Sequence, residues 1–214
     1  MTNIKEQSIK EDTNSTHNKI LNAAEDFFTN FGYLGTAVSQ IAKAVDITKA
    51  SLYYHFDSKQ ELFEEVLMKS FNELKAILDE IINMPLKAGE KLEKITFAYL
   101  EFGSKHGSLI QSTLSQFSKK EELILVKTVK RLKQEIMKLV EPLITVVLKQ
   151  SKNSQELNSE LVTQLYFNMM DSFLIRNSFK KEKYEYQEVA KQINLWLFNS
   201  GANSPGVSPP RESH

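Results

Sequence analysis

Long stretches without glycine or proline limit how this chain can fold more than any other feature. Its 214 residues include seven glycines and five prolines, and three of the prolines lie among the last ten residues. Neither residue occurs between Gly35 and Pro85, or between Gly107 and Pro142. Apolar residues recur at three-and-four spacing, and sustained alternation is missing. The sequence therefore predicts an all-α protein.

Composition and charge exclude several other classes of protein. Hydrophobic residues make up 41% of the chain and charged residues 25%, as in folded globular proteins. Cysteine is absent, which excludes disulfides, thiolate zinc sites and cysteine nucleophiles. No apolar run approaches the roughly 18 residues of a membrane span, so we expect a cytoplasmic protein that does not bind membranes. Because 27 basic residues balance 27 acidic ones, any nucleic-acid site must be local.

The predicted helices divide the chain into four parts. The polar, aperiodic residues 1–14 are expected to form a flexible arm, and residues 201–214 a flexible tail. Residues 15–65 hold three helices of falling length, the first ending at Gly32, and then the start of a long fourth helix. Residues 66–200 form a larger helical region, giving about nine helices in all. In this region we expect helices after the fourth over about 86–105, 109–117, 119–150, 159–179 and 184–199.

Helix start signals are clear in the first of these helical parts. Thr36 can cap the short second helix and Thr48 the short third helix, with a tight turn at Asp46 between them. Ser58 and Glu61 form a capping box at the start of a helix of about 25 residues. Two short helices joined by a tight turn and flanked by longer ones describe a helix-turn-helix.

The third helix leaves one face available for DNA. If Leu52 and Phe56 pack inward, the 100° step per residue turns its other side chains outward. Those facing away are Ala50, Ser51, Tyr53 and Tyr54, with Lys49 and His55 at the margins. Small residues allow close approach to a groove, and the polar groups can contact base edges.

Several residues of the motif can contact phosphates. Lys49 offers a positive charge to a guanine edge or a phosphate, while Tyr53 and His55 can donate hydrogen bonds to phosphates. Thr36 and Lys59 lie at helix N-termini, where backbone amides and the helix dipole favour anions.

A longer string of residues makes this pattern specific. It comprises Ile20-Leu21-Asn22-Ala23-Ala24, Phe27-Phe28, Phe31-Gly32-Tyr33, Thr36, Ile41-Ala42, Thr48 to Phe56, Ser58-Lys59 and Leu62. This stretch resembles the TetR family of bacterial transcription regulators. The resemblance implies that the third helix enters the major groove and that a homodimer binds double-stranded operator DNA. The DNA-contact positions that it implies are Thr36, Lys49, Ser51, Tyr53, Tyr54, His55 and Lys59, with Ala50 at the point of close approach.

The chain also departs from the family pattern. The turn usually carries glycine where this chain has Asp46, and arginine is common where it has Ser39. Only three arginines occur, Arg131, Arg176 and Arg211, and none lies in the motif. Bidentate reading of guanine by arginine is therefore excluded.

The apolar residues of the larger region have two uses beyond its core. One is pairing of the last two helices with a second copy in a four-helix bundle, an arrangement that the resemblance also implies. The candidate interface residues are Leu161, Leu165, Tyr166, Met170, Phe173, Ile193, Trp196 and Leu197. The other use is a pocket for a small hydrophobic ligand. The candidate pocket residues are Phe97, Tyr99, Phe102, Met137, Gln164, Asn168, Met169 and Asp171.

Two functions fit these observations. The first is a homodimeric DNA-binding transcriptional regulator, a repressor that a small hydrophobic ligand releases from its operator. The second is a DNA-binding dimer controlled by a protein partner or by its abundance. An enzyme is disfavoured, because the four histidines lack metal-ligand spacing, and neither a phosphate loop nor a Ser-His-acid set is found. We predict no catalytic residue, metal site or cofactor.

Overall fold

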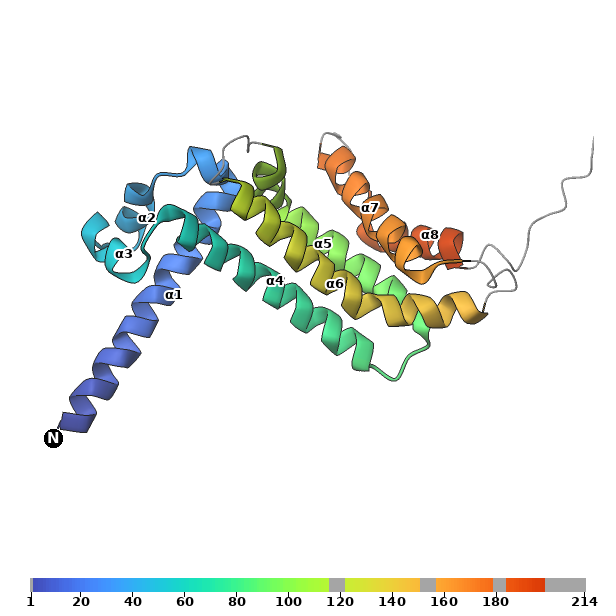
Figure 1. Ribbon diagram of the computed structural model, residues 1–214, viewed down its shortest axis with the longest axis horizontal. Helices are drawn as coiled ribbons and strands as arrows, with labels where there is room; N and C mark the ends of the chain where they lie inside the picture. Colours follow the sequence, from blue (N-terminus) through green and yellow to red (C-terminus); the bar gives the residue numbers. More distant parts are fainter. Residues whose placement is uncertain (1, 116–121, 151–156, 179–183, 199–214) are drawn as a thin grey trace, which may run out of the picture. The chain divides into compact units, whose positions relative to one another are not determined.

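The computed structural model describes residues 2–115, 122–150, 157–178 and 184–198, excluding the side chains of 2–14, 107–108, 110–124, 177–178 and 197–198. These ranges contain eight helices and no strand, which confirms the all-α prediction (Figure 1). The helices are α1 Thr2–Gly35, α2 Val38–Ala44, α3 Lys49–His55, α4 Lys59–Asn83, α5 Ala88–Ser115, α6 Glu122–Gln150, α7 Ser159–Ser178 and α8 Tyr186–Phe198. The predicted tail, residues 201–214, lies outside the described residues.

Two helices are longer than the sequence predicts. The backbone of residues 2–14 continues α1, so the predicted flexible arm is corrected to helix. No glycine or proline precedes Phe31, and the lysines, glutamates and glutamine of this segment are good helix formers. Likewise α5 runs through Gly103 and Gly107 to Ser115, so the separate helix predicted over 109–117 does not begin as a new element.

One compact unit comprises Met1–Lys75 and Phe102–Glu135. Its core takes apolar side chains from α1 to α4, all fully buried: Ile20, Ala24, Phe28, Ile41, Leu52, Leu62, Phe63, Val66 and Leu67. The ring of Phe63 meets those of Phe28 and Tyr33 edge-on, at centroid distances of 4.8 and 5.0 Å. The first helix breaks at Gly32 (φ 69°, ψ 174°), which redirects the chain towards α2.

The second unit comprises Ala76–Glu101 and Ile136–His214. A buried polar network joins three of its helices. The Tyr166 hydroxyl of α7 lies 2.6 Å from Oγ1 of Thr96 on α5, and Asn194 Nδ2 of α8 donates to the same oxygen at 3.0 Å. Burial raises the pKa of Tyr166, so its hydroxyl remains a donor. The network fixes these helices against one another because buried polar groups are costly when unpaired.

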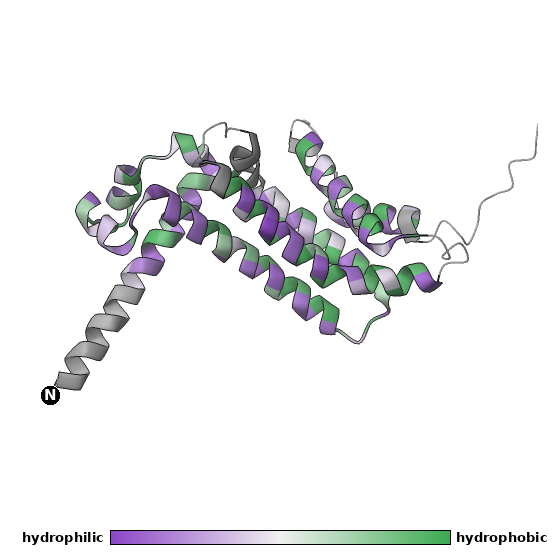
Figure 2. Ribbon diagram, viewed as in Figure 1, coloured by the Kyte–Doolittle hydropathy of each residue, from purple (hydrophilic) through white to green (hydrophobic). Residues whose placement is uncertain are grey.

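Figure 2 shows hydrophobic and hydrophilic residues interleaved along α4, α5 and α6, the pattern of amphipathic helices. In the part of the chain that the structure describes, no helix combines the length and the apolarity needed to cross a membrane.

Candidate nucleic-acid interface

The scaffold of the interface is the packing of α1, α2 and α3. On α3, Leu52 is fully buried, and Phe56 at its C-terminal end is 1% exposed. From α2, Val38, Ile41 and Ala42 face the same core. This burial is the arrangement that the sequence predicts, and it turns the remaining side chains of α3 towards solvent.

Thr36 fixes the connection between α1 and α2. Its hydroxyl donates to the backbone oxygens of Gly32, at 2.8 Å, and Phe27, at 3.1 Å, and only 2% of the residue is exposed. The predicted DNA contact by this side chain is therefore corrected, because its donor is used inside the protein. The predicted cap also moves by one residue: Ala37 is the N-cap of α2, and Gln40 Oε1 accepts from its amide at 2.9 Å.

The turn between α2 and α3 depends on Asp46. With φ at 57°, Asp46 is the one non-glycine residue with a positive φ among the described residues. Its amide donates to the Lys43 oxygen at 3.2 Å, and the Ile47 amide donates to the Ala42 oxygen at 3.0 Å. A left-handed residue is thus required at the position predicted for the tight turn.

Helix α3 presents the predicted reading face. Thr48 caps it, because its Oγ1 accepts from the Ser51 amide at 3.0 Å. The exposed residues include Lys49, Ala50, Tyr53 at 39% and Tyr54 at 84%, and Ser51 is half-buried. The Lys49 ammonium lies 5.7 Å from the centre of the Tyr53 ring. Charge, aromatic surface and small residues are therefore gathered on one short helix.

An open hollow lies beside this face. Its lining comes from both helices and the turn: Ser39, Ala42, Lys43, Asp46, Ile47, Thr48, Lys49 and Ser51. The sequence predicts no DNA contact by Ser39 or Lys43. Their spacing could have found them, because inward packing of Val38, Ile41 and Ala42 leaves these two residues, four apart, on the outer side of α2. Lys43 therefore adds a second positive charge next to Lys49.

His55 and Lys59 lie at the margin of the interface. His55 is half-buried, with its ring edge-on to those of Tyr54 at 5.7 Å and His17 at 6.3 Å. The Lys59 ammonium lies over the Tyr33 ring, 4.4 Å from its centre, and burial lowers the pKa of Lys59. A cation–π contact of this kind holds the charge near the first turn of α4.

The start of α4 is capped largely as predicted. Ser58 Oγ accepts from the Glu61 amide at 3.0 Å. The Glu61 carboxylate reaches back to the Asp57 amide, one residue earlier than in the predicted capping box. The first bond satisfies a backbone amide in the first turn of α4, and the second satisfies the amide of the residue before the cap.

Comparison of the sequence with known families supports this geometry. Residues 20–66 match the family described as "Bacterial regulatory proteins, tetR family". The N-terminal region of this chain is therefore similar to the TetR family.

Two relatives show how far the sequence similarity extends. The HTH-type transcriptional regulator YhgD of Bacillus subtilis is 35% identical over 104 residues, which cover 49% of this chain and 52% of YhgD. IcaR of Staphylococcus aureus, named as a negative regulator of the biofilm operon icaADBC, is 47% identical over 60 residues. That match covers 28% of this chain and 32% of IcaR. The chain thus spans about half the length of YhgD and a third of that of IcaR.

Solved structures extend the similarity of fold to most of the chain. The fatty acid degradation regulator FadR of Bacillus halodurans superposes with a TM-score of 0.71 at 20% identity, covering 85% of this chain and 94% of FadR. AibR was solved in complex with isovaleryl coenzyme A and operator DNA. It superposes with a TM-score of 0.67 at 17% identity, covering 86% of this chain and 98% of AibR. The named relatives are transcriptional regulators rather than enzymes.

The residues predicted for the dimer interface fall into two groups. Leu161, Leu165 and Trp196 are exposed at 54%, 57% and 69%. Tyr166, Met170 and Ile193 are buried at 0%, 0% and 8%, so their assignment to an interface is corrected to the core of the second unit. Phe173 is half-buried, with its ring near those of Tyr184 and Tyr186, and the side chain of Leu197 lies outside the described residues.

The pocket candidates are brought together only in part. The Tyr99 hydroxyl donates to Asp171 Oδ1 at 2.8 Å, and burial together with the Asp171 charge raises the pKa of Tyr99. Gln164 and Asn168 are exposed, which corrects their predicted place in an enclosed pocket. The half-buried candidates are Phe97, Met137 and Met169.

Phe102 belongs to the first unit. Its ring lies 6.0 Å from Phe71 and stacks on His106 at 4.6 Å. Its prediction as a pocket residue of the ligand-binding region is therefore corrected.

Proposed function

We propose that this chain is a homodimeric repressor that binds operator DNA through α3 and is released by a small hydrophobic ligand. The exposed face of α3 carries the DNA-binding part of the proposal. Two exposed tyrosines and Lys49 lie on this face, and the hollow beside it is lined by Lys43 as well as Lys49. Backbone and phosphate contacts by such groups position a helix in the major groove, and small residues permit its close approach.

Exposed leucines on α7 support the dimer. Leu161 and Leu165 are four residues apart on α7, and each is more than half exposed. Side chains at this spacing lie on one face of a helix. Trp196 on α8 is also exposed, at 69%. Exposed apolar side chains of this kind favour pairing with a second copy, as in a two-fold symmetric bundle.

The apolar second unit and the structural neighbours support a hydrophobic ligand. AibR was solved with an acyl coenzyme A, and FadR is named for fatty acid degradation. In this chain the Tyr99–Asp171 pair lies within the second unit and offers a polar group to orient an apolar molecule. We therefore expect acyl chains to be the first ligands to test. Repression agrees with the name of IcaR.

Selection of binding sites from random DNA duplexes tests the DNA-binding function without knowledge of the regulated gene. The protein should enrich a two-fold symmetric sequence, and Lys49→Ala should weaken binding. Because the dimer loses one lysine from each subunit, the slope of log affinity against log salt should become shallower by about 1.8. Lys75→Ala is the matched control, since it removes an exposed lysine from α4. Failure to enrich any sequence would refute the proposal.

Mass measurement by light scattering tests the dimer. Leu165→Glu should yield monomers at micromolar concentration, whereas Leu34→Glu, at the same 57% exposure but in the first unit, should remain dimeric. A panel of fatty acids and acyl coenzyme A esters should then displace the selected DNA from the dimer. If no member of a broad hydrophobic panel does so, control by a protein partner or by abundance is favoured instead.

A further inference from the structure

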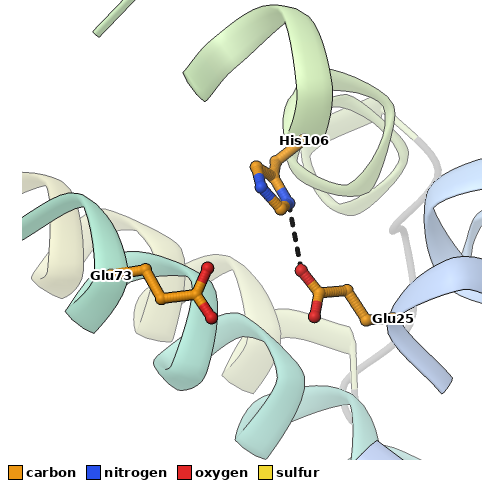
Figure 3. A group of neighbouring side chains, drawn as sticks. All are labelled: Glu25, Glu73 and His106. Atoms are coloured by element: carbon orange, nitrogen blue, oxygen red, sulfur yellow. Dashed lines mark ion pairs between the residues drawn. The ribbon is translucent and has the colours of Figure 1, made fainter. Parts of the chain in front are cut away.

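Three side chains from three helices converge in the first unit. Glu25 of α1, Glu73 of α4 and His106 of α5 each present one oxygen or nitrogen atom, and these atoms all lie within 4.8 Å of one another. Figure 3 shows the three side chains pointing toward a common space. The side chains of His106 and Glu25 are 3% and 14% exposed, whereas that of Glu73 is 48% exposed. His106 and Glu25 therefore form the buried part of the group, and Glu73 lies on the side that is open to solvent.

The imidazole of His106 is held in place, but one of its nitrogens, Nδ1, lacks a hydrogen-bond partner. Its ring stacks on Phe102, while Nδ1 is buried without a hydrogen bond and lies 3.4 Å from Glu25 Oε1 (Figure 3). A charge-assisted hydrogen bond would be shorter, about 2.7–2.9 Å. An unsatisfied buried nitrogen is rare in proteins and calls for an explanation, such as an ion.

The geometry around Nδ1 makes a cation a natural partner for His106. This nitrogen faces Glu25 Oε1 at 3.4 Å and forms no hydrogen bond to it. An unprotonated imidazole nitrogen and a carboxylate oxygen are both acceptors, so a cation placed between them would bind both lone pairs.

The distances suit a small divalent metal ion. Zinc binds imidazole nitrogen and carboxylate oxygen at about 2.0–2.2 Å in a tetrahedron, which places neighbouring ligand atoms roughly 3.3 Å apart. The separation between His106 Nδ1 and Glu25 Oε1 is 3.4 Å. The ligand atom of Glu73 lies within 4.8 Å of the other two, so it needs to move by at most about 1.5 Å, which a half-exposed glutamate can do by changing rotamer.

Lys69 binds one carboxylate oxygen of Glu25 and so determines which of the two is available to a metal ion. Its ammonium donates to Glu25 Oε2 and Asn22 Oδ1, both at 2.7 Å, and lies 3.9 Å from Glu73 Oε1. Ser70 Oγ donates a long hydrogen bond to Glu25 Oε1 at 3.4 Å, and this oxygen keeps a second lone pair for a metal ion. Lys69 therefore orients Glu25 through one oxygen and leaves the other directed at His106. A partner that fixes a ligating carboxylate in this way is typical of metal sites.

We propose that Glu25, Glu73 and His106 bind one divalent transition-metal ion, with Zn²⁺ as the best match to their ligand types. Water would complete the coordination on the side open to solvent. The ion would fasten α1, the first helix of the DNA-binding domain, to α4 and α5. Ligands separated by 48 and 33 positions in the sequence leave no local spacing signal, which explains why no metal site is predicted from the sequence.

Calorimetric titration of the full, untagged and chelator-treated protein with ZnCl₂ tests the site. The wild type should take up one ion per chain, and His106→Gln and Glu73→Gln should each lose at least roughly tenfold in affinity. Glu80→Gln is the matched control, because Glu80 is exposed on α4 two turns beyond Glu73. His17→Gln removes the other described histidine–glutamate pair, His17–Glu65, and should leave the affinity unchanged.

Thermal unfolding gives a second readout, the change in Tm on adding Zn²⁺. An ion pair that binds no metal would give no such change. Zn²⁺ should raise the Tm of the wild type and of Glu80→Gln, but not that of Glu73→Gln. Glu73 is half exposed, so this variant should fold even if His106→Gln does not. The proposal is overturned if the wild type shows no saturable uptake, or if Glu73→Gln and His106→Gln bind Zn²⁺ as tightly as Glu80→Gln. Neither measurement involves DNA, so each outcome is independent of the regulator proposal.

Discussion

Asp46 offers a direct test of the backbone geometry that orients α3. Its φ of 57° places a residue with a Cβ in the left-handed region, at the turn that precedes α3. We compare two substitutions at this position, Asp46→Gly and Asp46→Ala. Both remove the same exposed carboxylate, so any difference between them reports the backbone and not the charge.

The expected difference in stability can be worked from this angle. A residue with a Cβ costs roughly 1–2 kcal/mol in the left-handed conformation, and aspartate less than alanine because its side chain can hydrogen-bond locally. Glycine avoids this cost but loses about 0.4–1 kcal/mol through the greater freedom of the unfolded chain. The free energy of unfolding of Asp46→Gly should therefore be higher than that of Asp46→Ala by about 1 kcal/mol, and the value for the wild type should lie between them.

Urea unfolding followed by circular dichroism measures this difference, and the corresponding change in Tm should be about 3 °C. Both variants should also bind operator DNA at least as tightly as the wild type, because Asp46 lines the hollow beside Lys43 and Lys49. Equal stability of the two variants, or greater stability of Asp46→Ala, would show that the turn does not need a left-handed residue and would refute the reasoning.

Three further substitutions test individual hydrogen bonds by the same unfolding assay. Thr48→Ala removes the cap that accepts from the Ser51 amide and should lower the free energy of unfolding by about 1 kcal/mol, whereas Thr48→Ser should retain it. Tyr166→Phe leaves Thr96 without its 2.6 Å partner and should cost about 1–3 kcal/mol, while an unchanged stability would mean that the network is not formed. Thr36→Val keeps the shape of the side chain but removes its donor, and a loss of about 1 kcal/mol or more is expected; no loss would contradict the buried bonds.

Local signals in the sequence predict the DNA-binding domain well. A cap acts within three residues, a tight turn within four, and the inward direction of Leu52 and Phe56 follows from one helical turn. Thr48 and Ser58 form the expected bonds, and Asp46 has the expected conformation. Each of these features depends on neighbours in the chain, so the sequence alone is sufficient.

Features that depend on distant residues were harder to predict. Periodicity identifies an apolar face but does not say whether a core or a second copy covers it, which is why the sequence predicts Tyr166, Met170 and Ile193 at the interface although they are buried. Glycine in a helix costs about 1 kcal/mol, yet α5 continues through Gly103, which is buried, because packing outweighs propensity. Thr36 is a nearer case: its type and place predict a cap for α2, but its hydroxyl donates to residues four and nine positions earlier, in α1.

The sparse anchoring of α3 has a consequence for how this protein can evolve. Leu52 is the single buried residue of the seven in α3. Substitutions at exposed positions such as Lys49, Ala50 and Tyr54 should change stability by no more than about 0.5 kcal/mol. A duplicated copy of the gene could therefore acquire a new operator through a few changes on this helix while its product stays folded. For the same reason, α3 is a suitable place to install a chosen DNA specificity by randomising these positions.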